Sequence, residues 1–83
     1  MSPLNSEGTI DFLDAELELG RTLVRTAWNA KDDGDIDHYA RVKGNAAKAV
    51  ETIGRFIGKV PEGAVRTEIA NQLAELESLI SSL

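Results

Sequence analysis

Residues 9–30 have the sequence TIDFLDAELELGRTLVRTAWNA, in which apolar side chains recur mostly at spacings of three and four. Such spacings gather side chains on one side of a helix, and the residues between them are good helix formers. We therefore predict a helix over residues 9–31. Ser6 and Thr9 are both suitable N-caps, and acidic residues follow in the first turn, where the helix dipole stabilises negative charge.

A second helix is predicted after a segment that favours a turn. Residues 31–35, KDDGD, combine a glycine that can adopt positive φ with Asp side chains that cap or turn the backbone. The apolar pattern that follows predicts a helix over residues 35–58. Asp35 or Asp37 would cap its N-terminus.

The third helix is predicted over residues 61–82, because apolar residues there recur at spacings of three and four. Gly58 suits the end of the preceding helix, and Pro61 suits a first helical turn. Short connections make neighbouring helices antiparallel. The sequence therefore predicts a single all-α domain over residues 1–83, folded as an up-down-up antiparallel three-helix bundle that could dimerise into a larger helical bundle.

The chain has 83 residues, a net charge of −5, one histidine and no cysteine. A chain of this length buries only about 60% of its unfolded surface, so association with another chain would add useful stability. The missing cysteines exclude disulfides, thiol nucleophiles and thiolate metal sites. The first seven residues lack the basic and apolar segments of a signal peptide, and no later stretch approaches the roughly 20 apolar residues that span a bilayer. We therefore expect a cytoplasmic protein that does not enter a membrane.

Patterns for catalysis and metal binding are incomplete in this sequence. Residues 29–40 resemble an EF-hand calcium loop, but Lys31 occupies a ligand position and Ala40 replaces the closing bidentate glutamate. His38 is the only histidine, whereas a di-metal helical bundle needs Glu-x-x-His pairs from different helices. The sequence contains neither a G-x-S-x-G nucleophile motif nor a glycine-rich phosphate loop after a strand. We therefore predict that the protein is not an enzyme and has no catalytic, cofactor or metal site.

The first predicted helix has a wider apolar side than a small bundle needs. On a helical wheel its apolar residues occupy an arc of roughly 180°, more than two neighbouring helices cover. We therefore predict that Phe12, Leu19 and Leu23 belong to an interaction surface that meets another chain. The alternative is a central helix that is fully covered within a monomer.

Glu16 lies inside this apolar arc, beside Leu23 and Ala27 on the wheel. An acidic group in such a position needs either a partner or water. A carboxylate that reaches water from the core edge is the simpler interpretation, and a functional carboxylate in a groove or interface is the other. Lys43 is likewise a charged residue that lies among apolar residues on the wheel of the second predicted helix. A direct bond between Glu16 and Lys43 would span roughly 10 Å along the helices, so pairing across a dimer or separate exposure is favoured.

The most regular charged surface belongs to the second predicted helix. Four basic residues recur there at spacings of seven and four, which places them within about 40° on one side over about 27 Å. They are Arg41, Lys48, Arg55 and Lys59. An ordinary solvated face is the simplest interpretation. Docking to an acidic protein surface is the second, and the acidic first helix of another copy would provide one. Nucleic acid is the third, and the net charge of −5 argues against it.

Three glycines, Gly20, Gly44 and Gly54, fall inside predicted helices, where each costs about 1 kcal/mol relative to alanine. Close approach of two helices is the usual compensation. We therefore predict tight packing at these positions, with small-residue tracks formed by Ala40 with Gly44 and by Gly54 with Gly58. A ligand lying against the bare backbone is the alternative.

The sequence GDIDHYA at residues 34–40, with Ala46, Ala47 and Ile53, resembles the second helix of tetratricopeptide repeats and of three-helix trafficking domains that bind peptide helices. No repeat follows, and the resemblance assigns no functional residue. Together these observations predict a non-enzymatic protein–protein interaction or assembly module that self-associates through its first helix. Its expected partner is a second copy or another protein. The alternative is a nucleic-acid-associated accessory protein that uses the basic side of the second helix.

Overall fold

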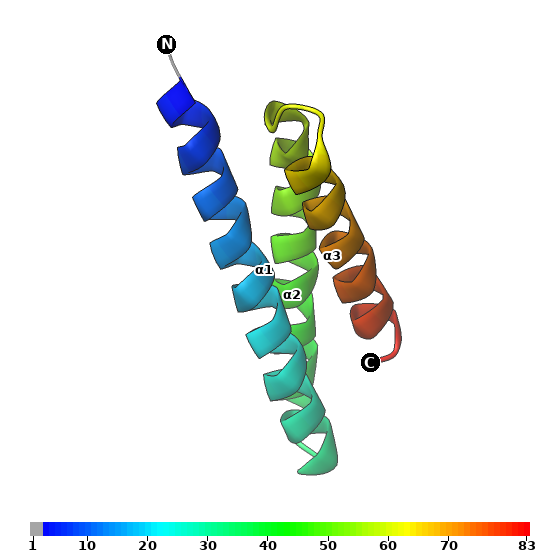
Figure 1. Ribbon diagram of the computed structural model, residues 1–83. Coiled ribbons are helices and arrows are strands. Elements are labelled where there is room, and N and C mark those ends of the chain that lie inside the picture. The colour runs from blue at the N-terminus through cyan, green and yellow to red at the C-terminus, as the bar shows by residue number, and fades with distance from the viewer. Residues whose placement is uncertain (1–2) are drawn as a thin grey trace.

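The computed structural model describes residues 3–83, and their side chains from Glu7 onward. Within this range the chain forms helices α1 (Pro3–Asp32), α2 (Ile36–Phe56) and α3 (Ala64–Ser81), with a short 3₁₀ helix, η1 (Ile57–Lys59), directly after α2. Successive α-helices run in opposite directions (Figure 1). This arrangement confirms the predicted all-α, up-down-up three-helix bundle.

The turn between α1 and α2 is closed by backbone hydrogen bonds. Gly34 adopts φ +78°, a left-handed conformation that favours glycine. The Asp35 N–H donates to the Ala30 carbonyl at 2.9 Å and the Gly34 N–H donates to the Lys31 carbonyl at 3.1 Å, which are the two bonds of a Schellman motif. On the α2 side, the His38 N–H donates to Asp35 Oδ1 at 3.1 Å. The predicted turn and the Asp35 N-cap are therefore confirmed.

α1 begins at Pro3 rather than at the predicted residue 9. Ser6 and Thr9 consequently lie within the helix, and their prediction as N-caps was wrong. Proline is compatible with a first helical turn, because the N–H that it lacks would have no helical partner there. The extra turns therefore need no capping side chain at Ser6 or Thr9.

α3 begins at Ala64, so the prediction that Pro61 occupies its first turn was wrong. Val60 has extended backbone angles, φ −84° and ψ 129°, and is only 2% exposed, so the link enters the core before the helix starts. Gly63 then adopts φ +153°, again a conformation that favours glycine, and redirects the chain into α3. The predicted end of the second helix at residue 58 falls within η1, which extends α2 to Lys59.

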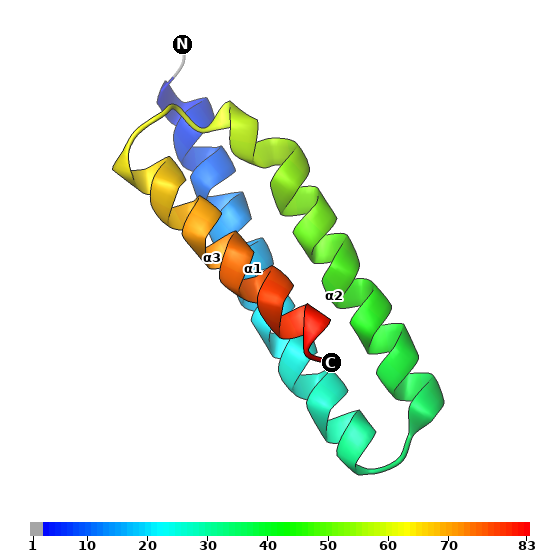
Figure 2. The ribbon, with the colours of Figure 1, turned by 90° about the vertical axis from the view of Figure 1, so that its right-hand side faces the viewer.

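α3 packs across one side of the hairpin that α1 and α2 form (Figure 2). The buried core draws on all three helices and on the link before α3. Its largest fully buried side chains are Leu13, Leu17, Ile53, Leu76 and Val60. α3 starts at the hairpin end that holds the N-terminus and stops before the α1–α2 turn (Figure 2). The opposite side of the hairpin has no helix on it within the described part of the chain.

The end of α3 is tied to the hairpin near its turn. The Tyr39 hydroxyl and Lys31 Nζ both donate to the carbonyl oxygen of Leu83, whose side chain is 8% exposed. Lys31 Nζ also lies 5.4 Å from the centre of the Trp28 ring and 5.9 Å from that of Tyr39, within the range of cation–π attraction. These contacts hold α3 on its own side of the hairpin.

The glycines inside the helices are of two kinds. A Cβ atom on Gly20 would lie 2.5 Å from Leu76 Cδ2, so α1 and α3 approach closely there and the predicted tight packing at Gly20 is confirmed. Gly44, Gly54 and Gly58 are exposed, and a Cβ atom on any of them would meet nothing within 4 Å. The predicted tight packing at Gly44 and Gly54 and the predicted small-residue tracks were therefore wrong, because these glycines, in α2 and η1, face open space and not another helix.

Candidate interaction face

α1 exposes apolar side chains on the side that α3 leaves open. Phe12 is 42% exposed, Leu19 is 46% exposed, and Leu23 is half-buried. Spacings of seven and four place the three residues along one line on the helix. The side of α1 that faces the core carries Leu13 and Leu17 instead, both fully buried. α1 is therefore not fully covered within one chain.

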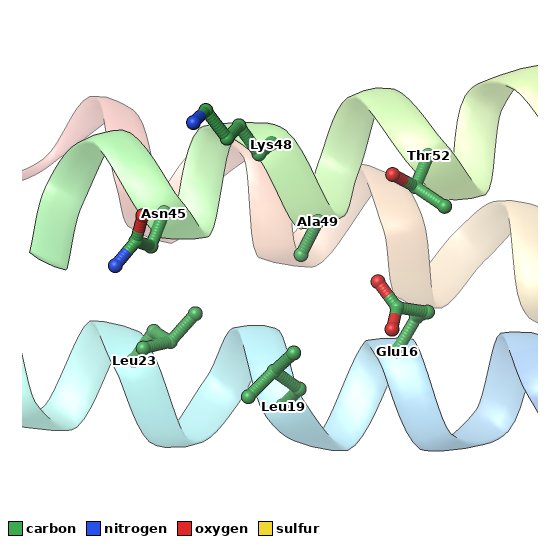
Figure 3. Close-up of a pocket in the computed structure, with 7 residues that line it drawn as sticks. All are labelled: Glu16, Leu19, Leu23, Asn45, Lys48, Ala49 and Thr52. Carbon is green, nitrogen blue, oxygen red and sulfur yellow. The ribbon is translucent and has the colours of Figure 1, made fainter.

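A shallow groove of about 320 Å³ runs between α1 and α2 beside these residues (Figure 3). The α1 side chains that line it point toward α2, whereas Lys48 extends away from α1 along the rim (Figure 3). Leu19, Leu23 and Ala49 make the groove apolar, and its rims carry polar and charged groups. Seven residues line it, namely Glu16, Leu19, Leu23, Asn45, Lys48, Ala49 and Thr52. We call these seven residues together with Phe12 the open face.

The open face joins two surfaces that the sequence analysis treats separately. Lys48 is one of the four aligned basic residues of the second predicted helix, which we call the basic stripe (Arg41, Lys48, Arg55 and Lys59), and it also lines the groove. At the end near the N-terminus, Lys59 Nζ lies 5.0 Å from the centre of the Phe56 ring, and that ring packs edge-on against Phe12 with 5.6 Å between ring centres. The basic side of α2 therefore borders the exposed apolar residues of α1 at two places.

All four residues of the predicted basic stripe are at the surface. Arg41 is exposed two helical turns before Lys48, and Lys59 is exposed beside Phe56. Arg55 Nη2 lies 3.9 Å from Glu51 Oε1, and both side chains of this pair are largely exposed. Exposed ion pairs of this kind contribute little, so Arg55 can exchange Glu51 for another carboxylate at small cost.

Glu16 and Lys43 lie on opposite sides of the hairpin. Glu16 is half-buried at the groove, with its carboxylate near Thr52 (Figure 3). Lys43 Nζ lies 5.8 Å from the centre of the Tyr39 ring, whose hydroxyl reaches the end of α3. Among the side chains described, Glu16 forms no ion pair, and its charge stays available in the groove. The expectation that these two residues do not pair directly within one chain agrees with this arrangement.

Asn45, Ala49 and Thr52 were not predicted as site residues, although they line the groove. The missing information was the register of the hairpin. The contact between Phe12 and Phe56 sets that register and brings Thr52 opposite Glu16. A helical wheel describes one helix at a time and so could not provide it.

Residues 29–40, which resemble a calcium loop, comprise the end of α1, the turn at residues 33–35 and the start of α2, where the Asp35 carboxylate caps the helix. No three His, Asp or Glu side chains among the described residues gather closely enough to hold a metal ion. Within residues 3–83 no helix combines the length and apolar character needed to cross a membrane.

Comparison with known proteins adds no relative. No family model, curated protein or solved structure matches this chain. The resemblance of residues 34–53 to tetratricopeptide repeats is thus not accompanied by a family match. The open face combines exposed apolar residues with bordering charges.

Proposed function

We propose that this protein is a small, non-enzymatic assembly module that binds a second copy of itself through the open face. One observation carries the proposal: Phe12 and Leu19 are 42% and 46% exposed, in line with Leu23 and beside a groove. Large apolar side chains that gather on one side of a monomer mark a surface that another molecule covers. Burial of such surface stabilises an assembly by roughly 25 cal/mol per Å².

The dimensions of the molecule support a second copy as the partner. The chain measures 50 × 18 × 15 Å, and the groove of the open face runs between the antiparallel helices α1 and α2 (Figure 3). A stable interface buries roughly 800 Å² on each partner, so the proposal requires contact along the whole side of the hairpin that α3 leaves open and not only at the groove. A chain of 83 residues also gains stability from association, because its own core is a single layer between three helices. Its cytoplasmic location stays a prediction from the sequence.

Replacement of Leu19 by glutamate tests the proposal. Leu19→Glu places a charge on the exposed apolar line, so we expect it to weaken self-association at least about tenfold and leave a folded monomer. Leu79→Glu is the matched control, because Leu79 is 44% exposed but belongs to α3, outside the open face. Light scattering over a concentration series measures the mass, and circular dichroism checks the fold. A wild-type monomer at every concentration, or equal effects of the two substitutions, would contradict the proposal.

Nucleic-acid binding through the basic stripe is the alternative function. The exposure of Arg41, Lys48 and Arg55 on α2 and of Lys59 on η1 supports it. The net charge of −5 and the acidic residues of α1 count against it, because phosphate contacts dominate such binding. Fluorescence anisotropy with labelled DNA and RNA at low salt separates the two functions. Salt-dependent binding that Arg41→Glu together with Lys48→Glu weakens would favour the alternative, and no binding at low salt would reject it.

A further inference from the structure

Two hairpins that meet face to face about a two-fold axis have two simple arrangements. If the axis runs along the hairpin, α1 of each copy lies on α2 of the other, and both α1–α2 turns lie at the same end. If the axis runs across the hairpin, α1 lies on α1, α2 lies on α2, and the turns lie at opposite ends. Facing helices are antiparallel in both arrangements, so helix direction does not choose between them.

The charge of α1 beside the open face is negative. Residues 7–18 contain five acidic residues and no basic residue. Asp11 and Glu18 are exposed, and each immediately precedes a residue of the exposed apolar line, Phe12 and Leu19 respectively. Consecutive residues lie about 100° apart around a helix, so the two carboxylates, seven residues apart, form a second line about a quarter turn around α1 from the apolar line.

The charge of α2 beside the open face is positive. Lys48 lines the groove, and Arg55 follows seven residues later on the same side of α2. Because facing helices are antiparallel, packing α1 on α1 about a centre near Leu19 would bring the two Glu18 side chains together, and the packing of α2 on α2 that accompanies it would bring the two Lys48 side chains together. Like charges brought together across an interface are costly, whereas α1 on α2 brings opposite charges together.

We infer that the dimer forms with α1 of each copy against α2 of the other, paired at its rim by Asp11 with Arg55 and by Glu18 with Lys48. This inference rests on the proposed self-association and adds which helices meet.

The register of the hairpin supports the two contacts. Because Phe12 packs on Phe56, Asp11 and Arg55 are about two residues from the same level, roughly 3 Å along the axis, and so are Glu18 and Lys48. A two-fold axis along the hairpin keeps these levels between copies.

The inferred contacts are confined to the half of the dimer that holds the N-termini. One step of seven residues nearer the turn, Arg25 and Arg41 would stand at corresponding positions with the same sign of charge. Asp11 with Arg55 and Glu18 with Lys48 are therefore the only rim pairs that we assign.

A distance between the two turns tests the arrangement without disturbing the interface. The chain has no cysteine, so Asp33→Cys places a single spin label at the exposed turn. With α1 on α2 the two labels should lie within about 25 Å, because stacked helices are about 10 Å apart and the labels add their own length. With α1 on α1, centred near Leu19, the labels would be about 40 Å apart at 1.5 Å per residue. Pulsed electron resonance distinguishes these distances.

The outcomes separate this inference from the proposed function. A dimer with the short distance supports both. A dimer with the long distance overturns the arrangement and leaves self-association standing. A monomer by light scattering at the labelling concentration overturns both.

Charge reversal gives an independent test with a rescue. Lys48→Glu with Arg55→Glu should weaken the dimer about tenfold or more, as should Asp11→Lys with Glu18→Lys, and the four changes in one chain should restore it. Restored dimerisation would be specific to α1 on α2. With α1 on α1 each helix faces its own equivalent, so combining the substitutions of both helices would create no new pair of opposite charges. The inference would be overturned if neither double substitution weakened the dimer. It would also be overturned if the variant with all four substitutions dimerised as weakly as the two double variants.

Two further comparisons accompany the reversal series. The single change Lys48→Glu should also weaken the dimer, and Lys43→Glu is its control: it changes the net charge equally but lies beside Tyr39 on the other side of the hairpin, so it should leave the dimer intact. Raising the ionic strength from about 0.05 M to about 0.5 M should weaken a dimer held by opposite charges. A dimer that strengthens with salt would contradict α1 on α2.

Discussion

Gly20 and Gly44 are both interior helical glycines, yet only Gly20 lies against another helix. The backbone of α1 at Gly20 is reached by Leu76 of α3, whereas Gly44 has open space where a side chain would be. The same residue type therefore has opposite consequences for stability at the two positions. At Gly44, glycine only lowers the stability of the helix relative to alanine. At Gly20, glycine has the same cost but also allows α3 to approach α1 closely.

We expect Gly44→Ala to stabilise the protein by about 0.5 to 1 kcal/mol, because alanine restricts the unfolded chain and meets nothing in the fold. Gly20→Ala should destabilise it by about 1 kcal/mol, since the new Cβ forces Leu76, which is only 1% exposed, to move within a packed core. Urea unfolding followed by circular dichroism at one protein concentration measures both. Equal stabilisation by the two substitutions would show that α3 does not press on Gly20.

At the scale of a helix, α3 is held by one buried line of side chains. Ile69 and Leu76 are 2% and 1% exposed, while Leu79 is 44% exposed on the same helix. Its far end is tied down by the hydrogen bonds that Tyr39 and Lys31 donate to Leu83. A narrow buried line suits a helix that covers one side of a hairpin, and the rest of α3 faces water.

The stability cost of a substitution on α3 should therefore depend strongly on whether the residue faces the core or water. Leu76→Ala should cost about 3 kcal/mol, because it leaves a cavity between α1 and α3. Leu79→Ala, the same chemical change, should cost less than about 1 kcal/mol, because Leu79 is already 44% exposed. Chemical denaturation of both variants checks this expectation. Similar costs for the two would mean that α3 packs through a different side.

At the scale of the whole molecule, α3 covers one side of a long hairpin, and no other helix of the described residues covers the opposite side. The described chain is elongated, 50 × 18 × 15 Å, and its open face lies between α1 and α2. A second hairpin on that face would give each α1 and α2 a neighbour on both sides, as in a larger helical bundle. Self-association would then contribute directly to the stability of the fold.

The melting temperature should consequently depend on protein concentration. Association that favours the folded state stabilises it by mass action, so we expect the wild-type melting temperature to rise by a few degrees for each tenfold increase in concentration. Leu19→Glu should melt at a temperature that does not change with concentration, because it removes the association. Differential scanning calorimetry over a concentration series tests this. A wild-type midpoint that does not move would argue that the folded chain is stable as a monomer.

Much of the fold follows from residues close together in the chain. Three apolar patterns of helical period predict the number and order of the helices, and the turn at Gly34 and the cap at Asp35 are confirmed because both depend on the backbone within a few residues. The predicted starts of the first and third helices were wrong. The first helix starts earlier than predicted, because Pro3 is compatible with a first helical turn. The third starts later, because Val60 is buried in the core before the helix begins.

The sequence by itself thus determined the all-α class, the helix order and the excess of apolar surface on the first helix, since periodicity is a property of one helix at a time. Only the tertiary structure decided which side of that helix α3 covers and the register of α2 against it. Those two choices leave Phe12, Leu19 and Leu23 uncovered and bring Asn45, Lys48 and Thr52 beside them. They depend on contacts such as Phe12 with Phe56 and Gly20 with Leu76, between residues more than forty positions apart, which no local pattern encodes.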